Sequence, residues 1–242
     1  MKKIVNSTKC LFLIALFTLP PLLAEAQLQQ PNCFPDPDSL GCTPIEELTA
    51  TITPPGYPEC EIEVTYEFGV CQGVLQIANV SFSSVPAGIC EDFILDLIDT
   101  FFNGTELQLE RFLTDLYFGA LDQIADMLFQ EALDEAIANN SLSLLYCDSG
   151  LNTFTVGFYA GSCASFCVGR NDVGEFAIDL VSCGPTCCSL NKTYCIDAAT
   201  GETVVEESVE QVNPGECLAT PLPQCAAGSF FQSPCFEICE TE

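Results

Sequence analysis

Hydrophobic and polar residues alternate strictly after Cys60, and this pattern predicts a β-strand. The apolar positions are Cys60, Ile62, Val64, Tyr66, Phe68 and Val70. The opposite face carries Glu59, Glu61, Glu63, Thr65 and Glu67. Alternation with a period of two places one face of a strand in the core and the other in water. A turn at residues 71–73 leads into a second apolar strand at 74–82, so the sequence predicts a β-hairpin.

The apolar residues that follow recur with a helical period and predict three consecutive helices. The first helix is expected from Gly88 to Phe102. Thr105 begins the second as its N-cap, with Gln108 placed to complete a capping box. Gly119 is expected to end the second helix, and the third follows from Leu121. Such a block of helices buries a core of its own.

Strand patterns return after Cys147. They predict strands at residues 151–160, 175–182, 193–198 and 202–209, the last two joined as a hairpin. The order of elements favours an α+β fold: a β-hairpin, three consecutive helices, then a disulfide-stapled antiparallel β region.

We interpret the chain as four segments. Residues 1–26 are expected to be a signal peptide, and 27–58 a proline-rich N-terminal lead-in. Residues 59–212 are expected to form a single α+β domain, onto which the Cys- and Pro-rich tail, 213–242, packs. A boundary near Cys147, which would give two domains, is the alternative.

The signal-peptide prediction depends on the first 26 residues. Lys2, Lys3 and Lys9 give a basic start, and Cys10–Leu23 is an apolar run too short for a stable membrane anchor. Ala24-Glu25-Ala26 fits a cleavage site. We therefore expect a secreted, periplasmic or cell-surface protein with no membrane span after signal removal.

Cysteine usage agrees with export. The chain has 17 cysteines, and removing Cys10 with the signal leaves an even number. Paired cysteines in an exported chain indicate a disulfide framework. The spacing of Cys163 and Cys167 with Cys183 and Cys187 also suits a four-thiolate zinc site, but thiols oxidise outside the cytoplasm, which favours disulfides.

The charge balance excludes several classes of function. The chain has 34 acidic and 6 basic residues, a net charge of −28, and no histidine. Only Arg111, Arg170 and Lys192 are basic beyond the signal peptide. A polyanion is repelled by nucleic acids and by anionic lipid surfaces. The lack of histidine excludes Ser-His-Asp and Cys-His catalysis.

The row of glutamates on the first predicted strand is the candidate calcium site. Glu59, Glu61, Glu63 and Glu67 point to one side, about 6.6 Å apart for neighbours two residues apart. Carboxylate oxygens suit Ca²⁺, so weak Ca²⁺ binding is one hypothesis. A solvated face that discourages edge-to-edge pairing is the simpler interpretation.

No residue is singled out as catalytic, and no cofactor is indicated beyond that weak Ca²⁺. We predict an exported, non-enzymatic structural or interaction protein whose partner is an unknown protein or a cell surface. A Ca²⁺-dependent extracellular binding module is the first alternative. A carboxylate-based hydrolase is the second, and it would require one acidic side chain buried beside another in a cleft.

Overall fold

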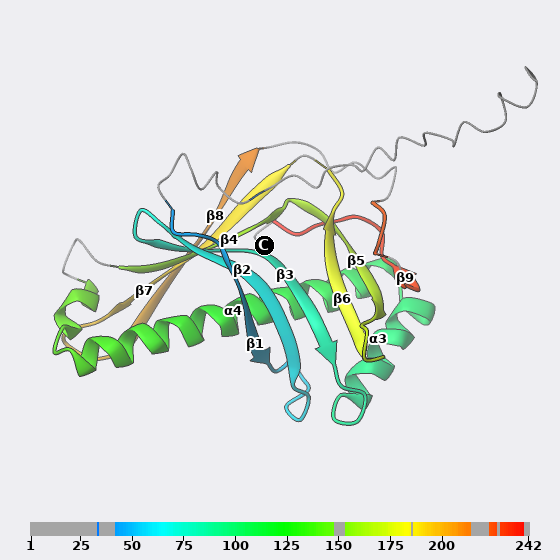
Figure 1. Ribbon diagram of the computed structural model, residues 1–242, viewed down its shortest axis with the longest axis horizontal. Helices are drawn as coiled ribbons and strands as arrows, with labels where there is room; N and C mark the ends of the chain where they lie inside the picture. The colour runs from blue at the N-terminus through cyan, green and yellow to red at the C-terminus, as the bar shows by residue number, and fades with distance from the viewer. Residues whose placement is uncertain are drawn as a thin grey trace, which may run out of the picture.

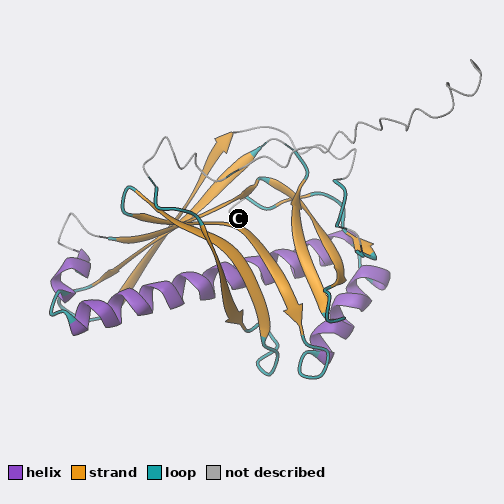
Figure 2. Cartoon of the chain, in the orientation of Figure 1, coloured by secondary structure: helices purple, strands orange, loops and turns teal. Residues whose placement is uncertain are grey.

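The structure, a computed structural model, describes residues 33, 42–147, 153–184, 186–213, 223–226 and 228–239. Within these residues the chain forms one mixed sheet of ten strands and two α-helices (Figure 1; Figure 2). The predicted α+β fold with three consecutive helices is therefore wrong, because the protein is mostly β-sheet. The predicted signal peptide lies outside the described residues.

The sheet arches over the longer helix, and the shorter helix lies at one end of it (Figure 1). The helices are α3 (Glu91–Asn103) and α4 (Glu106–Ala138), followed by the 3-10 turn η1 (Leu142–Leu145). The first five strands are β1 (Glu46–Ile52), β2 (Ile62–Cys71), β3 (Val74–Val85), β4 (Phe154–Gly161) and β5 (Cys163–Arg170). The others are β6 (Phe176–Ser182), β7 (Cys187–Ile196), β8 (Thr203–Asn213), β9 (Phe231–Gln232) and β10 (Phe236–Glu237).

The sheet divides into two branches along β3. One edge of β3 pairs with β2. On the other edge, residues 75–78 pair in parallel with β4, whereas residues 81–85 pair antiparallel with β6. Between these stretches Asn79 has a φ of +52°, a left-handed conformation that asparagine tolerates better than most residues. The branch β4-β7-β8 therefore separates from the branch β6-β5-β10 at Asn79.

The predicted hairpin is confirmed as β2 and β3, joined at Gln72 and Gly73, which both have positive φ. Ile62 and Val64 of β2 are fully buried and belong to the same core as the apolar face of α4. This core forms because the dry face of the sheet and the apolar stripe of the helix remove each other from water.

The second and third predicted helices are one helix, α4, of 33 residues. Its predicted start is confirmed: the Thr105 hydroxyl accepts from the Gln108 backbone N–H, and the Gln108 side chain accepts from the Thr105 N–H at 2.8 Å. The backbone N–H groups of Thr105 and Gln108, which have no acceptor within the helix, are both hydrogen-bonded in this way. Gly119, which we expected to end the helix, lies within it.

Gly119 serves a close contact and not a helix end. A Cβ at this position would lie 2.7 Å from Cγ of Pro55 in the β1–β2 connection. One turn on, the Gln123 side chain accepts from the Thr53 N–H and donates to the Thr53 carbonyl, both at 2.8 Å. The glycine allows the connection to approach the helix, and the glutamine fixes it there.

Replacing Gly119 by alanine is expected to lower the free energy of unfolding by about 1–3 kcal/mol. The added methyl group would collide with Pro55, and this outweighs the advantage of about 1 kcal/mol that alanine has in a helix. Urea denaturation measures the change. Because Pro55→Ala removes the obstructing ring, G119A should cost much less in a P55A background. An equal loss in both backgrounds would contradict the close-contact explanation.

Four strands lie where the sequence predicted none: β1, β5 and the two-residue strands β9 and β10 of the predicted tail. β1 falls within the predicted lead-in and pairs with β2 from Glu46 to Ile52. β5 occupies a segment predicted as a connection between strands. Seven of its eight residues are buried, so it shows no alternation of polar and apolar positions.

Disulfides hold the sheet and its flanking segments together. All fifteen cysteines among the described residues are disulfide-bonded, so the zinc interpretation of Cys163, Cys167, Cys183 and Cys187 is wrong. Seven of these bonds have both cysteines among the described residues: Cys33–Cys187, Cys42–Cys71, Cys60–Cys90, Cys147–Cys195, Cys167–Cys225, Cys183–Cys235 and Cys188–Cys239. The predicted disulfide framework is thus confirmed.

Candidate functional site

A cavity of about 320 Å³ lies between α4 and the branch β4-β7-β8. Its apolar lining comes from four elements and the C-terminal segment: Tyr117, Phe118, Leu121, Phe158, Ala160, Leu190, Val209 and Ile238. The disulfide of Cys188 and Cys239 also borders it, and Asp122 and Glu207 are its two charged lining residues. This volume is at the lower end of the range for ligand pockets, about 300–1,000 Å³.

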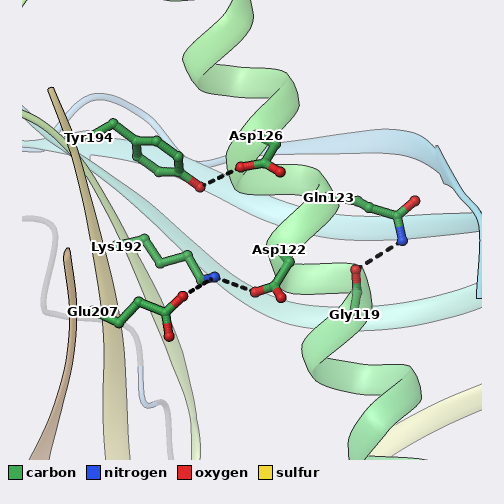
Figure 3. A network of polar contacts seen from close by, with 7 residues as sticks. All are labelled: Gly119, Asp122, Gln123, Asp126, Lys192, Tyr194 and Glu207. Carbon is green, nitrogen blue, oxygen red and sulfur yellow. Dashed lines mark hydrogen bonds and ion pairs between the residues drawn. The ribbon is translucent and has the colours of Figure 1, made fainter. Parts of the chain in front are cut away.

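A buried lysine joins the two carboxylates at the cavity. The ammonium of Lys192 contacts Oδ1 of Asp122 and lies 2.6 Å from Oε1 of Glu207 (Figure 3). The Lys192 side chain is 6% exposed, whereas those of Asp122 and Glu207 are 52% and 57% exposed. The positive charge is therefore sheltered, while both negative charges remain accessible.

The spacing of residues on α4 and β7 explains this arrangement. Tyr194 follows Lys192 by two residues, about 6.6 Å along the same face of a strand. Asp126 follows Asp122 by one helical turn, a separation of about 6 Å. The two steps match, so the Tyr194 hydroxyl donates to Oδ1 of Asp126 at 2.9 Å beside the ion pair. Glu207 is the cross-strand partner of Lys192 on β8.

The surroundings raise the pKa of three groups here. Burial lowers the pKa of Lys192, but its hydrogen bonds to Asp122 and Glu207 and their charges outweigh this, so the pKa lies above its ordinary value. Burial raises the pKa of Tyr117. Burial, and then the hydrogen bond to Asp126, raise the pKa of Tyr194.

These shifts predict a loss of stability at alkaline pH. A raised pKa in the folded state stabilises the fold fully below the pKa of the unfolded chain, about 10 for tyrosine and lysine. This stabilisation is lost as the pH rises from the pKa of the unfolded chain through the higher pKa of the folded state. We expect the free energy of unfolding to be level from pH 8 to about pH 10 and to fall above it. Urea denaturation across this range measures the fall, which Tyr117→Phe and Tyr194→Phe should make shallower. An unchanged slope in both variants would contradict the assignment.

A second apolar feature is exposed on the surface at the end of α3. We call it the phenylalanine cluster: Phe101, Phe102, Phe230 and Phe231. The ring of Phe231 lies 5.2, 4.9 and 4.9 Å from those of Phe101, Phe102 and Phe230. Phe102 is 68% exposed. The cluster shares no residue with the lining of the cavity, so the two can be tested separately.

No family model, no curated protein and no solved structure matches this chain. The function is therefore inferred from the residues of the site itself.

Of the predicted calcium ligands, Glu59 and Glu61 lie just before β2, and Glu63 and Glu67 lie within it. Glu59, Glu61 and Glu63 are exposed and Glu67 is partly buried. The carboxylate of Glu63 accepts from the Ser83 hydroxyl at 3.1 Å, and that of Glu67 accepts from the Asn79 side chain at 2.8 Å. Across the described ranges no group of three or more acidic or sulfur side chains is placed to hold a metal ion. Calcium binding by these glutamates remains a prediction.

No described helix is both long and apolar enough to cross a membrane.

The residues at the cavity were not singled out by the sequence. In the sequence, Lys192 stands out only as one of three basic residues, and nothing distinguishes Asp122 and Asp126 from the other acids. A usable signal is present: two acids one turn apart lie on the longest helix of a chain that has very few cations. Their pairing with Lys192 and Tyr194 depends on how β7 lies against α4, which no local pattern specifies.

Proposed function

We propose that the protein is an exported, non-enzymatic binding protein that holds a small, largely apolar molecule in the cavity between α4 and the branch β4-β7-β8. The observation that carries the proposal is the cavity itself: about 320 Å³, lined mainly by aromatic and aliphatic side chains, with two carboxylates and a buried lysine at one side. An apolar pocket with few polar groups is the usual form of a small-molecule site.

The disulfides support an extracellular location. They are numerous, and several join distant parts of the chain, such as Cys33 with Cys187 and Cys167 with Cys225. Such bonds persist in oxidising compartments and are rare in the cytoplasm. Together with the signal peptide expected at residues 1–26, they support a secreted, periplasmic or cell-surface protein.

The charge arrangement supports binding over acid–base hydrolysis. A hydrolytic pair of carboxylates needs one member protonated and one ionised, which mutual repulsion or an apolar environment secures. Asp122 and Glu207 instead share the ammonium of Lys192, which offsets part of the repulsion between them. Both carboxylates are also about half exposed to solvent.

A neutral fluorescent probe, N-phenyl-1-naphthylamine, tests the proposal. We expect saturable binding with increased fluorescence, because the naphthyl ring leaves water for the apolar cavity. Ala160→Phe and Val209→Phe each fill the cavity from a different strand and should weaken binding at least about tenfold. Circular dichroism and thermal melting show whether each variant folds.

Phe102→Ser is the matched control, since it removes the most exposed ring of the phenylalanine cluster and leaves the cavity unchanged. This variant should bind the probe with the affinity of the wild type. The proposal fails if both cavity-filled proteins fold and bind the probe as well as the wild type. It also fails if F102S alone abolishes binding, because the probe then occupies the surface cluster.

A further inference from the structure

We propose that the cavity selects a cationic amphiphile: a molecule whose protonated amine lies against Asp122 and Glu207 and whose apolar part fills the space beside Phe158 and Leu190. This inference rests on the proposed function, and it specifies the chemical class of the ligand. The first argument is the charge of the cavity wall. Asp122 and Glu207 are its two charged lining residues, and both are acidic.

Lys192 does not cancel these charges. One ammonium faces two carboxylates, and Asp126 adds a third negative charge one turn further along α4. The other two basic residues among those described, Arg111 and Arg170, do not line the cavity. The wall of the cavity therefore has a net negative charge, in a protein whose overall charge is −28.

The polar contacts leave room for a second cation. Asp122 uses Oδ1 on Lys192, and Glu207 uses Oε1. In the contacts of the described residues, Oδ2 of Asp122 and Oε2 of Glu207 have no partner within the protein, and Figure 3 shows both oxygens directed away from the ammonium. A carboxylate accepts several hydrogen bonds, so a ligand ammonium can bind these oxygens without displacing Lys192.

Binding of an anionic head group is disfavoured at this site. Its natural partner would be Lys192, but that side chain is 6% exposed and its ammonium already binds two carboxylates. A ligand carboxylate would have to displace one of them and then face the other at close range. The order of preference expected from charge is thus amine first, alcohol second and carboxylate last.

The apolar part of the ligand would pack against apolar side chains of the cavity. Phe158 and Leu190 are directly opposite each other on β4 and β7, and Leu121 comes from α4, next to Asp122 in the sequence. An alkyl chain placed there is stabilised in proportion to the apolar surface that leaves water, whatever head group it carries. Ligands with one chain length and different head groups therefore isolate the effect of charge.

Isothermal titration calorimetry with octylamine, 1-octanol and octanoate at pH 7 and low salt tests the inference. We expect octylamine to bind about tenfold more tightly than 1-octanol, the effect of one charge contact at a partly exposed site. Octanoate should bind more weakly than 1-octanol. Raising the ionic strength should reduce the difference between amine and alcohol.

Two single substitutions shift the preference in opposite directions. Glu207→Gln removes one negative charge and leaves Asp122 to pair with Lys192, so the amine-over-alcohol ratio should fall several-fold, to about three. Lys192→Met keeps an unbranched side chain of similar length and removes the positive charge, so the ratio should rise above that of the wild type. A purely structural role of Lys192 would not increase selectivity for the amine.

Equal affinities for all three probes would overturn this inference and leave the proposed apolar site standing. Tightest binding of octanoate would likewise overturn it, as would an unchanged ratio in both variants. If none of the three probes binds, the proposed function itself fails. The two proposals therefore fail through different results.

Discussion

Replacing Asp122 and Glu207 together by Asn and Gln is expected to lower the free energy of unfolding by about 3–5 kcal/mol. The double variant leaves the ammonium of Lys192 buried without an opposite charge, since its two ion-pair partners are these carboxylates. Removing the partners of a buried charge costs more than the pair itself contributes, because the remaining charge stays out of water. Urea denaturation at pH 7 measures the loss.

Lys192→Met in the same background is the control. It removes the buried charge that makes the double variant unstable, so D122N/E207Q/K192M should recover much of the lost stability. K192M alone should cost far less than the double variant, because Asp122 and Glu207 are half exposed and water can solvate them. A triple variant no more stable than the double one would show that the buried charge is not the cause.

Removing the disulfide between Cys60 and Cys90 by C60A/C90A is expected to cost about 3–4 kcal/mol. The bond joins the start of β2 to the start of α3 across 30 residues, and both cysteines are buried. Its main effect is to restrict the unfolded chain, an effect that depends on the length of the closed loop. Guanidinium denaturation without reductant measures the change.

The Cys42–Cys71 bond offers a matched comparison, because its loop spans 29 residues. If loop closure dominates, C42A/C71A should cost about as much as C60A/C90A, to within about 1 kcal/mol. A loss below about 1 kcal/mol in one variant, with the full loss in the other, would show that local packing and not chain entropy determines the contribution.

Much of the secondary structure could be predicted, because period and capping are local properties. The face of β2 that carries Ile62 and Val64 and the capping box at Thr105 were both correctly predicted. Gly119 was misread, because a glycine that ends a helix and a glycine that admits a close neighbour look alike in sequence. The neighbour, Pro55, is more than sixty residues away along the chain.

The fold class could not be predicted for two reasons. β5 is buried on both faces and so lacks the alternation that marks a strand. The division of the sheet at Asn79 depends on which strands come to pair with each half of β3, and β4 and β6 are both distant in sequence. The number of helices was also predicted wrongly. The second and third predicted helices are the single helix α4, so the protein has one long helix under an arched sheet in place of a block of three helices.

The candidate site was the least predictable part of the molecule. The sequence pointed to the glutamate row of β2, where charge density is obvious, and not to Asp122 and Glu207, which are separated by more than eighty residues. Lys192 and Tyr194 meet Asp122 and Asp126 because a strand step and a helical turn have similar lengths. That match becomes visible only when β7 is known to lie along α4.

A crystal structure with 8-bromooctan-1-ol, located by the anomalous signal of bromine, tests the central claim most directly. The alcohol is neutral, so it reports on the apolar cavity independently of any preference for charge. We predict a bromine peak between α4 and β4-β7-β8, in van der Waals contact with Phe158 and Leu190. A cavity that stays empty while bromine collects on the phenylalanine cluster, or nowhere on the protein, would contradict the account.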